Sequence, residues 1–147
     1  MNKHGFAAFA ASLCLMTASV TASADEHPYS EGPVVNVASI RTLEGKFDDY
    51  MSWLATTWKQ LQEESKKKGY IVDYQVLSVE ARGPNDPNIL LVTTYKNWAA
   101  LDGALAKGDE VSKAIEGSVA AANKAQGERD QIRRVLGSQT MQRLILK

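Results

Sequence analysis

The chain has 147 residues, in which 17 Lys and Arg balance 17 Asp and Glu, so its formal net charge is zero at pH 7. This balance excludes a protein that binds nucleic acid through a basic surface, because neutralising phosphates requires an excess of Lys and Arg. The one cysteine, Cys14, lies in an apolar N-terminal run. The rest of the chain therefore has no thiol for catalysis, metal binding or redox exchange.

The N-terminus has the pattern of a secretory signal peptide. Lys3 provides a positive charge, the run from Gly5 to Val20 is almost free of charge, and Ala22-Ser23-Ala24 fits an A-x-A cleavage site. The alternative is a retained membrane anchor, but Ser and Thr interrupt the run, which is short for a membrane-spanning helix. We expect residues 1 to 24 to be a signal peptide cleaved near Ala24, which predicts a periplasmic or secreted protein without stable membrane insertion.

After the cleavage site we expect a flexible leader over residues 25 to 33 and one domain over residues 34 to 147. The first strand of this domain is predicted over Val34 to Arg41, which is rich in Val and Ile. A helix follows, closed by Gly69 as a C-cap glycine. Its apolar stripe recurs at helical spacing at Phe47, Tyr50, Met51, Leu54, Trp58 and Leu61.

Two strands and a turn are predicted next. Tyr70 to Glu80 alternates in the manner of a strand, with Tyr74 on one face and Asp73 and Gln75 on the other. A loop dense in Gly, Pro and Asn connects it to a strand over Ile89 to Tyr95.

The remaining chain is predicted to be helical up to its last strand. Asn97 can cap a helix that breaks at Lys107-Gly108, and Asp109 can cap the next helix. Gly137 is expected to end the helical region, and Thr140 to Lys147 has the alternation of a final strand.

The resulting order, βαββαβ, is the split βαβ arrangement of the ferredoxin-like fold, an α+β fold with a four-stranded antiparallel sheet and helices on one face. The predicted strands are apolar on both faces, so the uncovered face needs a partner. Two sheets stacked face to face in a symmetric homodimer would bury it.

The segment Thr42-Leu43-Glu44-Gly45-Lys46 before the first helix, Gly69 before a strand, and the run from Leu91 to Trp98 resemble the dimeric α/β-barrel superfamily. This superfamily includes antibiotic-biosynthesis and haem-degrading monooxygenases. The resemblance implies a ligand between the helices and the sheet, near Tyr95. Haem-degrading members use a histidine in the second helical region, and this sequence has none between Trp98 and Gly137. We therefore predict no haem or other cofactor.

Polar and aromatic side chains on the predicted helix-facing side are candidates for a ligand site or for ordinary core packing. Asn36 shares a strand face with Ala38 and Ile40, and Trp53 lies to one side of the helical stripe. The ligand-binding candidates are Asn36, Trp53, Tyr74, Thr93 and Tyr95.

The opposite sheet face is the expected dimer interface, where Asp73, Gln75 and Arg143 are the candidates. A carboxylate in such a place needs a cationic partner, and Arg143 could supply one to Asp73. No metal site is predicted. A Ser-His-Asp triad has little support, because the only histidine after residue 24 is His27 in the leader.

The sequence thus predicts an exported homodimer that binds a small, partly apolar molecule, and it assigns no catalytic residue. A cofactor-independent monooxygenase-like enzyme is the first alternative. Such an enzyme would contribute positioning and polar contacts to its substrate. A non-catalytic structural or interaction protein is the second.

Overall fold

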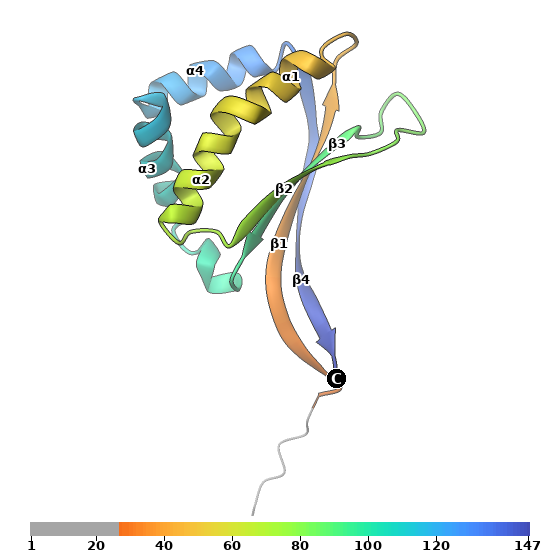
Figure 1. Ribbon diagram of the computed structural model, residues 1–147, viewed down its shortest axis with the longest axis vertical. Coiled ribbons are helices and arrows are strands. Elements are labelled where there is room, and N and C mark those ends of the chain that lie inside the picture. Colours follow the sequence, from red (N-terminus) through yellow and green to blue (C-terminus); the bar gives the residue numbers. More distant parts are fainter. Residues whose placement is uncertain (1–26) are drawn as a thin grey trace, which may run out of the picture.

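A single antiparallel sheet is covered on one face by all the helices of the described chain (Figure 1). The computed structural model describes residues 27–147. The predicted signal peptide, residues 1 to 24, lies outside the described residues.

The four strands are β1 (Tyr29–Thr42), β2 (Asp73–Ser78), β3 (Ile89–Tyr95) and β4 (Arg133–Leu146). Their order across the sheet is β2-β3-β1-β4, and every neighbouring pair is antiparallel. This is the order of a ferredoxin-like sheet, and it leaves β2 and β4 as open edges. The predicted α+β class and the four-stranded antiparallel sheet are therefore confirmed.

The first helical layer is one continuous rod made of α1 (Phe47–Trp53), the π-helical η1 (Leu54–Trp58) and α2 (Lys59–Lys67). Its apolar stripe faces the sheet and buries Tyr50, Leu54 and Trp58. Gly69 follows with a φ of 73°, a conformation that glycine adopts without steric cost. The predicted helix and its glycine stop are thus both present.

The second helical layer contains η2 (Trp98–Leu101), α3 (Ala104–Glu116) and α4 (Val119–Arg129). Asn97 caps η2 as predicted, since its side chain accepts a hydrogen bond from the Ala100 amide at 3.1 Å.

The predicted breaks inside this second layer were wrong. The chain turns at Gly103 and Gly117, whose φ angles are 67° and 81°. Gly108 and Asp109 lie within α3. Ala104 to Glu116 continues as a helix through Gly108, because one glycine inside a helix costs only about 1 kcal/mol.

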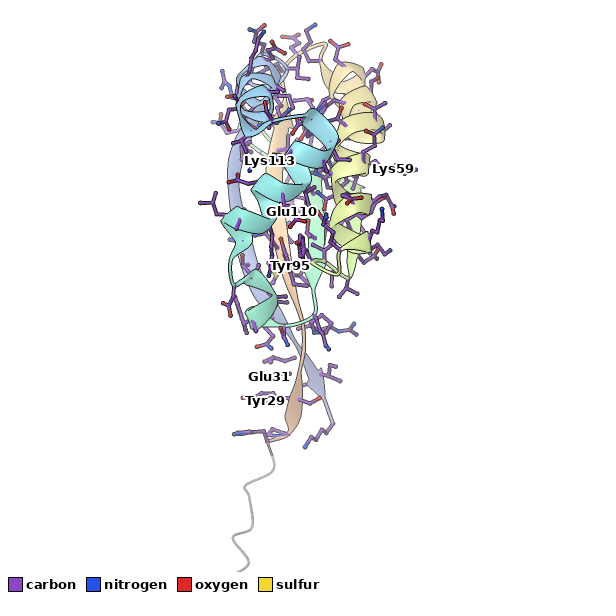
Figure 2. All side chains as sticks on the ribbon, turned by 90° about the vertical axis from the view of Figure 1, so that its left-hand side faces the viewer. Tyr29, Glu31, Lys59, Tyr95, Glu110 and Lys113 are labelled. Carbon is purple, nitrogen blue, oxygen red and sulfur yellow. The ribbon has the colours of Figure 1, made fainter. Side chains whose placement is uncertain are left out.

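Both ends of the long β1–β4 pair also differ from the sequence prediction. β1 begins at Tyr29, so the last part of the expected leader is strand. β4 begins at Arg133, and Gly137, predicted to end a helix, lies inside it at an irregularity in the pairing with β1. Together, β1 and β4 extend beyond the helical layer and carry Tyr29 and Glu31 there (Figure 2). The reason is tertiary: pairing along β1 provides a ladder of hydrogen bonds that local periodicity does not reveal.

The core lies between the first helical layer and the sheet. Ile40 of β1 and Ile89 of β3 pack against Tyr50, Leu54 and Trp58. Since side chains alternate along a strand, Asn36 and Ala38 share the helix-facing side with Ile40. The Trp58 and Tyr74 rings meet edge to face at 5.3 Å, which places Tyr74 on this same side.

None of the helices in residues 27–147 lies over the other face of the sheet (Figure 1). Across its middle, Gln75, Val92, Val37 and Gln139 form one row of paired residues. Apolar side chains on this face are substantially exposed, with Leu77 at 43% and Met141 at 44%. Within residues 27–147, none of the helices has both the length and the apolar character needed to cross a bilayer.

Candidate functional site

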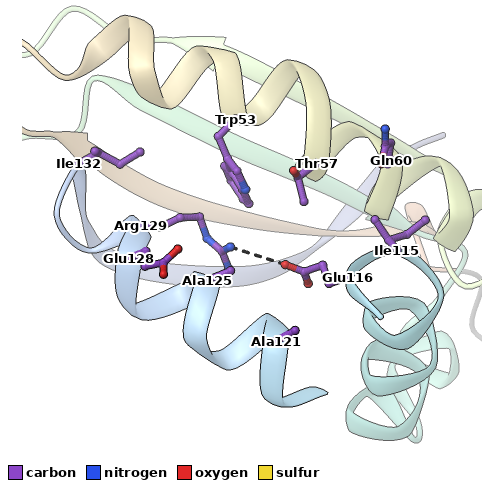
Figure 3. Close-up of a pocket in the computed structure, with 10 residues that line it drawn as sticks. All are labelled: Trp53, Thr57, Gln60, Ile115, Glu116, Ala121, Ala125, Glu128, Arg129 and Ile132. Carbon is purple, nitrogen blue, oxygen red and sulfur yellow. Dashed lines mark ion pairs between the residues drawn. The ribbon is translucent and has the colours of Figure 1, made fainter. Parts of the chain in front are cut away.

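A cavity of about 440 Å³ separates the two helical layers (Figure 3). One side belongs to the α1–η1–α2 rod and the other to α3, α4 and the start of the turn into β4. Half of the ten lining residues are polar or charged and half are apolar: Trp53, Thr57, Gln60, Ile115, Glu116, Ala121, Ala125, Glu128, Arg129 and Ile132.

The apolar side of the cavity is built on Trp53, the last residue of α1. Its ring stacks on Tyr50 with a centroid distance of 5.5 Å and an interplanar angle of 18°. Tyr50 is itself buried in the core, so Trp53 is held in place by the packing of the first helix. Small side chains at Ala121 and Ala125, one turn apart on α4, leave space opposite the ring.

The charged side of the cavity is Arg129, the last residue of α4. Its guanidinium lies between Trp53 and Ala125 and points toward Glu116 (Figure 3). The guanidinium carbon is 4.5 Å from the Trp53 ring centroid, a cation–π arrangement. Nη2 donates to Gln126 Oε1 at 2.9 Å, whereas Nη1 is 3.8 Å from Glu116 Oε1, which is too long for a hydrogen bond.

Both members of this ion pair are removed from solvent. The Arg129 side chain is 12% exposed and the Glu116 side chain 10%. Burial lowers the pKa of Arg129 from its ordinary value, and the neighbouring Glu116 carboxylate opposes this effect. A charge in such a place is costly unless its hydrogen bonds are made.

Those hydrogen bonds are incomplete. In the part of the chain that the structure describes, the buried side-chain nitrogen and oxygen atoms without a hydrogen-bond partner are Nε and Nη1 of Arg129 and the same two atoms of Arg133. Arg133 is 5% exposed, and its Nη1 is 3.5 Å from Asp130 Oδ1. Native proteins rarely leave buried donors without an acceptor, so these four nitrogen atoms are an unusual feature of the site.

The two arginines flank the same aromatic pair. The Arg133 guanidinium carbon is 5.8 Å from the Tyr50 ring centroid, while Arg129 lies over Trp53. Burial raises the pKa of Tyr50, and the charges of Arg133 and Arg129 oppose that rise. Tyr50 therefore remains neutral, and the positive charge of the cluster comes from the two guanidinium groups.

The backbone on the opposite wall is irregular. Residues Leu54–Trp58 form a π-helical turn, and Thr57 within it lines the cavity. The Thr56 hydroxyl donates to the Ser52 carbonyl oxygen at 2.8 Å. Short π-helical insertions in α-helices often occur at functional sites.

Of the ligand-binding candidates, only Trp53 lines this cavity. Tyr74, Thr93 and Asn36 instead form one row across the sheet, continued by Thr140 on β4. The Asn36 amide donates to the Thr140 hydroxyl at 2.8 Å, so it has a structural partner. The Tyr74 hydroxyl donates to Glu63 on α2, a bond that raises the pKa of Tyr74 to about 12.

Tyr95 lines a second, smaller cavity of about 120 Å³, together with Tyr70, Ile71 and Lys107. Burial raises the pKa of Tyr95. The structure thus brings Asn36, Thr93 and Tyr95 to one face of the sheet, but it does not place them in the cavity that contains Arg129.

The dimer-interface candidates lie on different edges of the sheet. Asp73 starts β2, and its carboxylate pairs with Lys66 of α2 at 3.3 Å. Arg143 is on β4, at the other edge, with β3 and β1 in between. Within one chain Asp73 and Arg143 are therefore apart, and their pairing across a dimer interface stays a prediction. Gln75 lies on the open face in the row through Val92.

Sequence reasoning missed Glu116, Arg129 and Arg133. A signal existed for one of them: Ala121, Ala125 and Arg129 recur every four residues, so an arginine continues a face of small side chains. Glu116 gave no such signal. Among residues 27–147, His, Cys, Asp and Glu side chains form no group of three that could hold a metal ion.

Comparison with known proteins identifies the fold. No protein-family model matches the chain, and no curated protein matches it either. Three solved structures are similar, each with a TM-score of 0.50. HapK from Hahella chejuensis is 12% identical, and the match covers 75% of this chain and 91% of HapK. SO0527 from Shewanella oneidensis is 17% identical, and the match covers 80% of this chain and 96% of SO0527. A dimeric ferredoxin-like protein from an uncultured marine organism is 13% identical, and the match covers 78% of this chain and 97% of that protein. The chain therefore has the ferredoxin-like fold that its resemblance to the dimeric α/β-barrel superfamily implied.

Proposed function

We propose that this protein is an exported homodimer that binds a small, partly apolar molecule in the cavity between its two helical layers. One observation carries the proposal: the cavity sets the Trp53 ring beside Arg129, a buried charged side chain whose hydrogen bonds are incomplete.

The composition and size of the cavity support ligand binding. Small-molecule sites are concave spaces of about 300 to 1,000 Å³, mostly apolar and with a few convergent polar groups. Here the apolar part is Trp53, Ile115 and Ile132, and the polar part is as large, with Arg129 opposed by the carboxylates of Glu116 and Glu128. The cavity lies between helices rather than directly on the sheet, so Asn36 and Thr93 do not line it.

The open face of the sheet supports a homodimer. Val37, Val92 and Leu90 lie on the face that no helix covers, together with the exposed Leu77 and Met141. Contiguous apolar surface of this kind marks an interface. One structural neighbour is described as a dimeric ferredoxin-like protein, which agrees with this assembly.

Export rests on the sequence pattern of residues 1 to 24. N-terminal sequencing of protein recovered from its producing cell should begin at or within a few residues of Asp25. Intact Met1 in the membrane fraction would contradict the assignment.

Native mass spectrometry of protein purified from its own host tests ligand binding. We expect a small molecule to remain bound to the wild type and to be lost from Ala125→Trp, because the larger ring fills the space opposite Trp53. Ala120→Trp, on the exposed side of the same helix, is the matched control and should retain it. Equal retention in both variants would move the site elsewhere.

A further inference from the structure

We infer that the molecule bound in the cavity carries a carboxylate, which Arg129 receives, on an aromatic or similarly flat apolar body that lies along Trp53. This inference rests on the proposed function and adds the chemical class of the ligand.

The unmet donors identify the charged end of the ligand. A guanidinium has five N–H groups and no acceptor, so the group that satisfies it must be an acceptor. Among the described residues, Arg129 makes one side-chain hydrogen bond, from Nη2 to the neutral amide of Gln126. A carboxylate is the strongest common acceptor for this cation, and its flat shape matches the guanidinium plane.

The geometry around Arg129 favours a planar anion that approaches from the edge. One face of the guanidinium is covered by the Trp53 ring at 4.5 Å, and Ala125 lies near it on the α4 side (Figure 3). Nε and Nη1 have almost no exposed surface, and Glu116 stands beside Nη1, so an anion reaches that nitrogen only when the Glu116 side chain turns aside. The Glu116 carboxylate lies 3.8 Å from Nη1 and forms no hydrogen bond with it. Nη1 therefore attracts a carboxylate but still lacks one at hydrogen-bond distance.

Arg133 adds a second positive charge next to the first. Its own carboxylate partner, Asp130, is 62% exposed, which weakens that pairing through screening by water. Two carboxylates, Glu116 and Glu128, line the cavity, and Glu116, which faces Arg129, must turn aside when a ligand carboxylate enters. Removing the charge of Glu116 should therefore strengthen anion binding rather than weaken it.

The test uses benzoate as the probe and benzamide, which has the same ring without the charge, as its comparison. Calorimetric titration of the full mature chain should show that benzoate binds about tenfold or more tightly than benzamide, as expected for charge-assisted hydrogen bonds. Arg129→Gln should reduce benzoate affinity to the benzamide level and leave benzamide unchanged. Glu116→Gln should increase benzoate affinity.

Two further variants control for charge and for folding. Lys124→Gln removes a positive charge from the exposed side of α4 and should leave both affinities unchanged. Arg129→Lys keeps a charge, so it should bind benzoate at an intermediate level if Arg129→Gln does not fold.

The outcomes separate this inference from the proposed function. Equal affinity for the two probes, both abolished by Ala125→Trp, would keep the ligand site but overturn its preference for a carboxylate. The same conclusion follows if benzoate does not bind while Ala125→Trp still loses a host molecule. If neither probe binds and Ala125→Trp retains the host molecule, both the inference and the proposed site are wrong.

Discussion

Arg129 stacks on Trp53, with 4.5 Å between the guanidinium carbon and the ring centroid. The two residues end α4 and α1, so this contact joins the second helical layer to the first. It also holds the guanidinium at the wall of the cavity. The same contact therefore has a structural and a binding consequence, and the two can be measured separately.

The structural consequence is a coupling free energy. In a Glu116→Gln background, which avoids leaving a buried carboxylate unpaired, a double-mutant cycle of Trp53→Leu and Arg129→Met should give about 1 kcal/mol of coupling in the free energy of unfolding. Urea denaturation measures it. The matched cycle of Trp53→Leu with Lys124→Met should give none, because Lys124 is exposed on α4. A coupling close to zero in the first cycle would mean that the contact between Trp53 and Arg129 adds nothing to the free energy of unfolding.

Tyr74 should titrate abnormally because of Glu63. The pKa of Tyr74 is raised from 10.0 to about 12 when folded, so the bond contributes stability that is present below pH 10 and is lost as the pH rises toward 12. Difference absorbance of tyrosinate should show its titration moving back toward 10 in Glu63→Gln. Tyr74→Phe identifies the signal, since the abnormal step must disappear from that variant. The same step in Glu63→Gln as in the wild type would refute the assignment.

The open sheet face should hold the dimer together. Light scattering on the mature wild type should give about twice the chain mass, with an interface of about 1,200 to 2,000 Å². Val92→Lys places a charge in the middle of the row through Val37 and should yield a folded monomer. Thr56→Lys, exposed on the helical side, should remain dimeric. A wild type that is monomeric at micromolar concentration would leave this apolar face unexplained.

Tyr95 should matter for packing rather than for binding in the cavity of Arg129. Tyr95→Phe loses one hydroxyl and should change the free energy of unfolding by less than about 1 kcal/mol, whereas Tyr95→Ala should cost about 3 kcal/mol. Thermal and urea denaturation distinguish the two. Benzoate affinity should be unchanged in Tyr95→Phe, because Tyr95 lines the smaller cavity. A weaker affinity there would place the ligand against β3 instead.

The sequence by itself determined the order of the elements and the inward faces of the first helix and β3. Helical spacing follows from backbone geometry, so it places Tyr50, Leu54 and Trp58 on one apolar stripe, and all three lie in the core. Alternation along the strands also places Asn36 and Thr93 on one face, where the structure pairs them directly. The predicted strand Ile89 to Tyr95 has the observed bounds.

Only the tertiary structure decided where β4 begins and which charges are buried. The residues from Arg133 to Leu136 are strand because β1 pairs with them, a long-range contact that no local pattern encodes. Arg129 and Glu116 look like any other charged residues on a helix. They become a buried pair beside Trp53 because the chain turns at Gly117, so that α3 lies beside α2 while α4 brings Arg129 to Trp53 of α1. Periodicity reports which face of an element is apolar, but packing decides which faces meet.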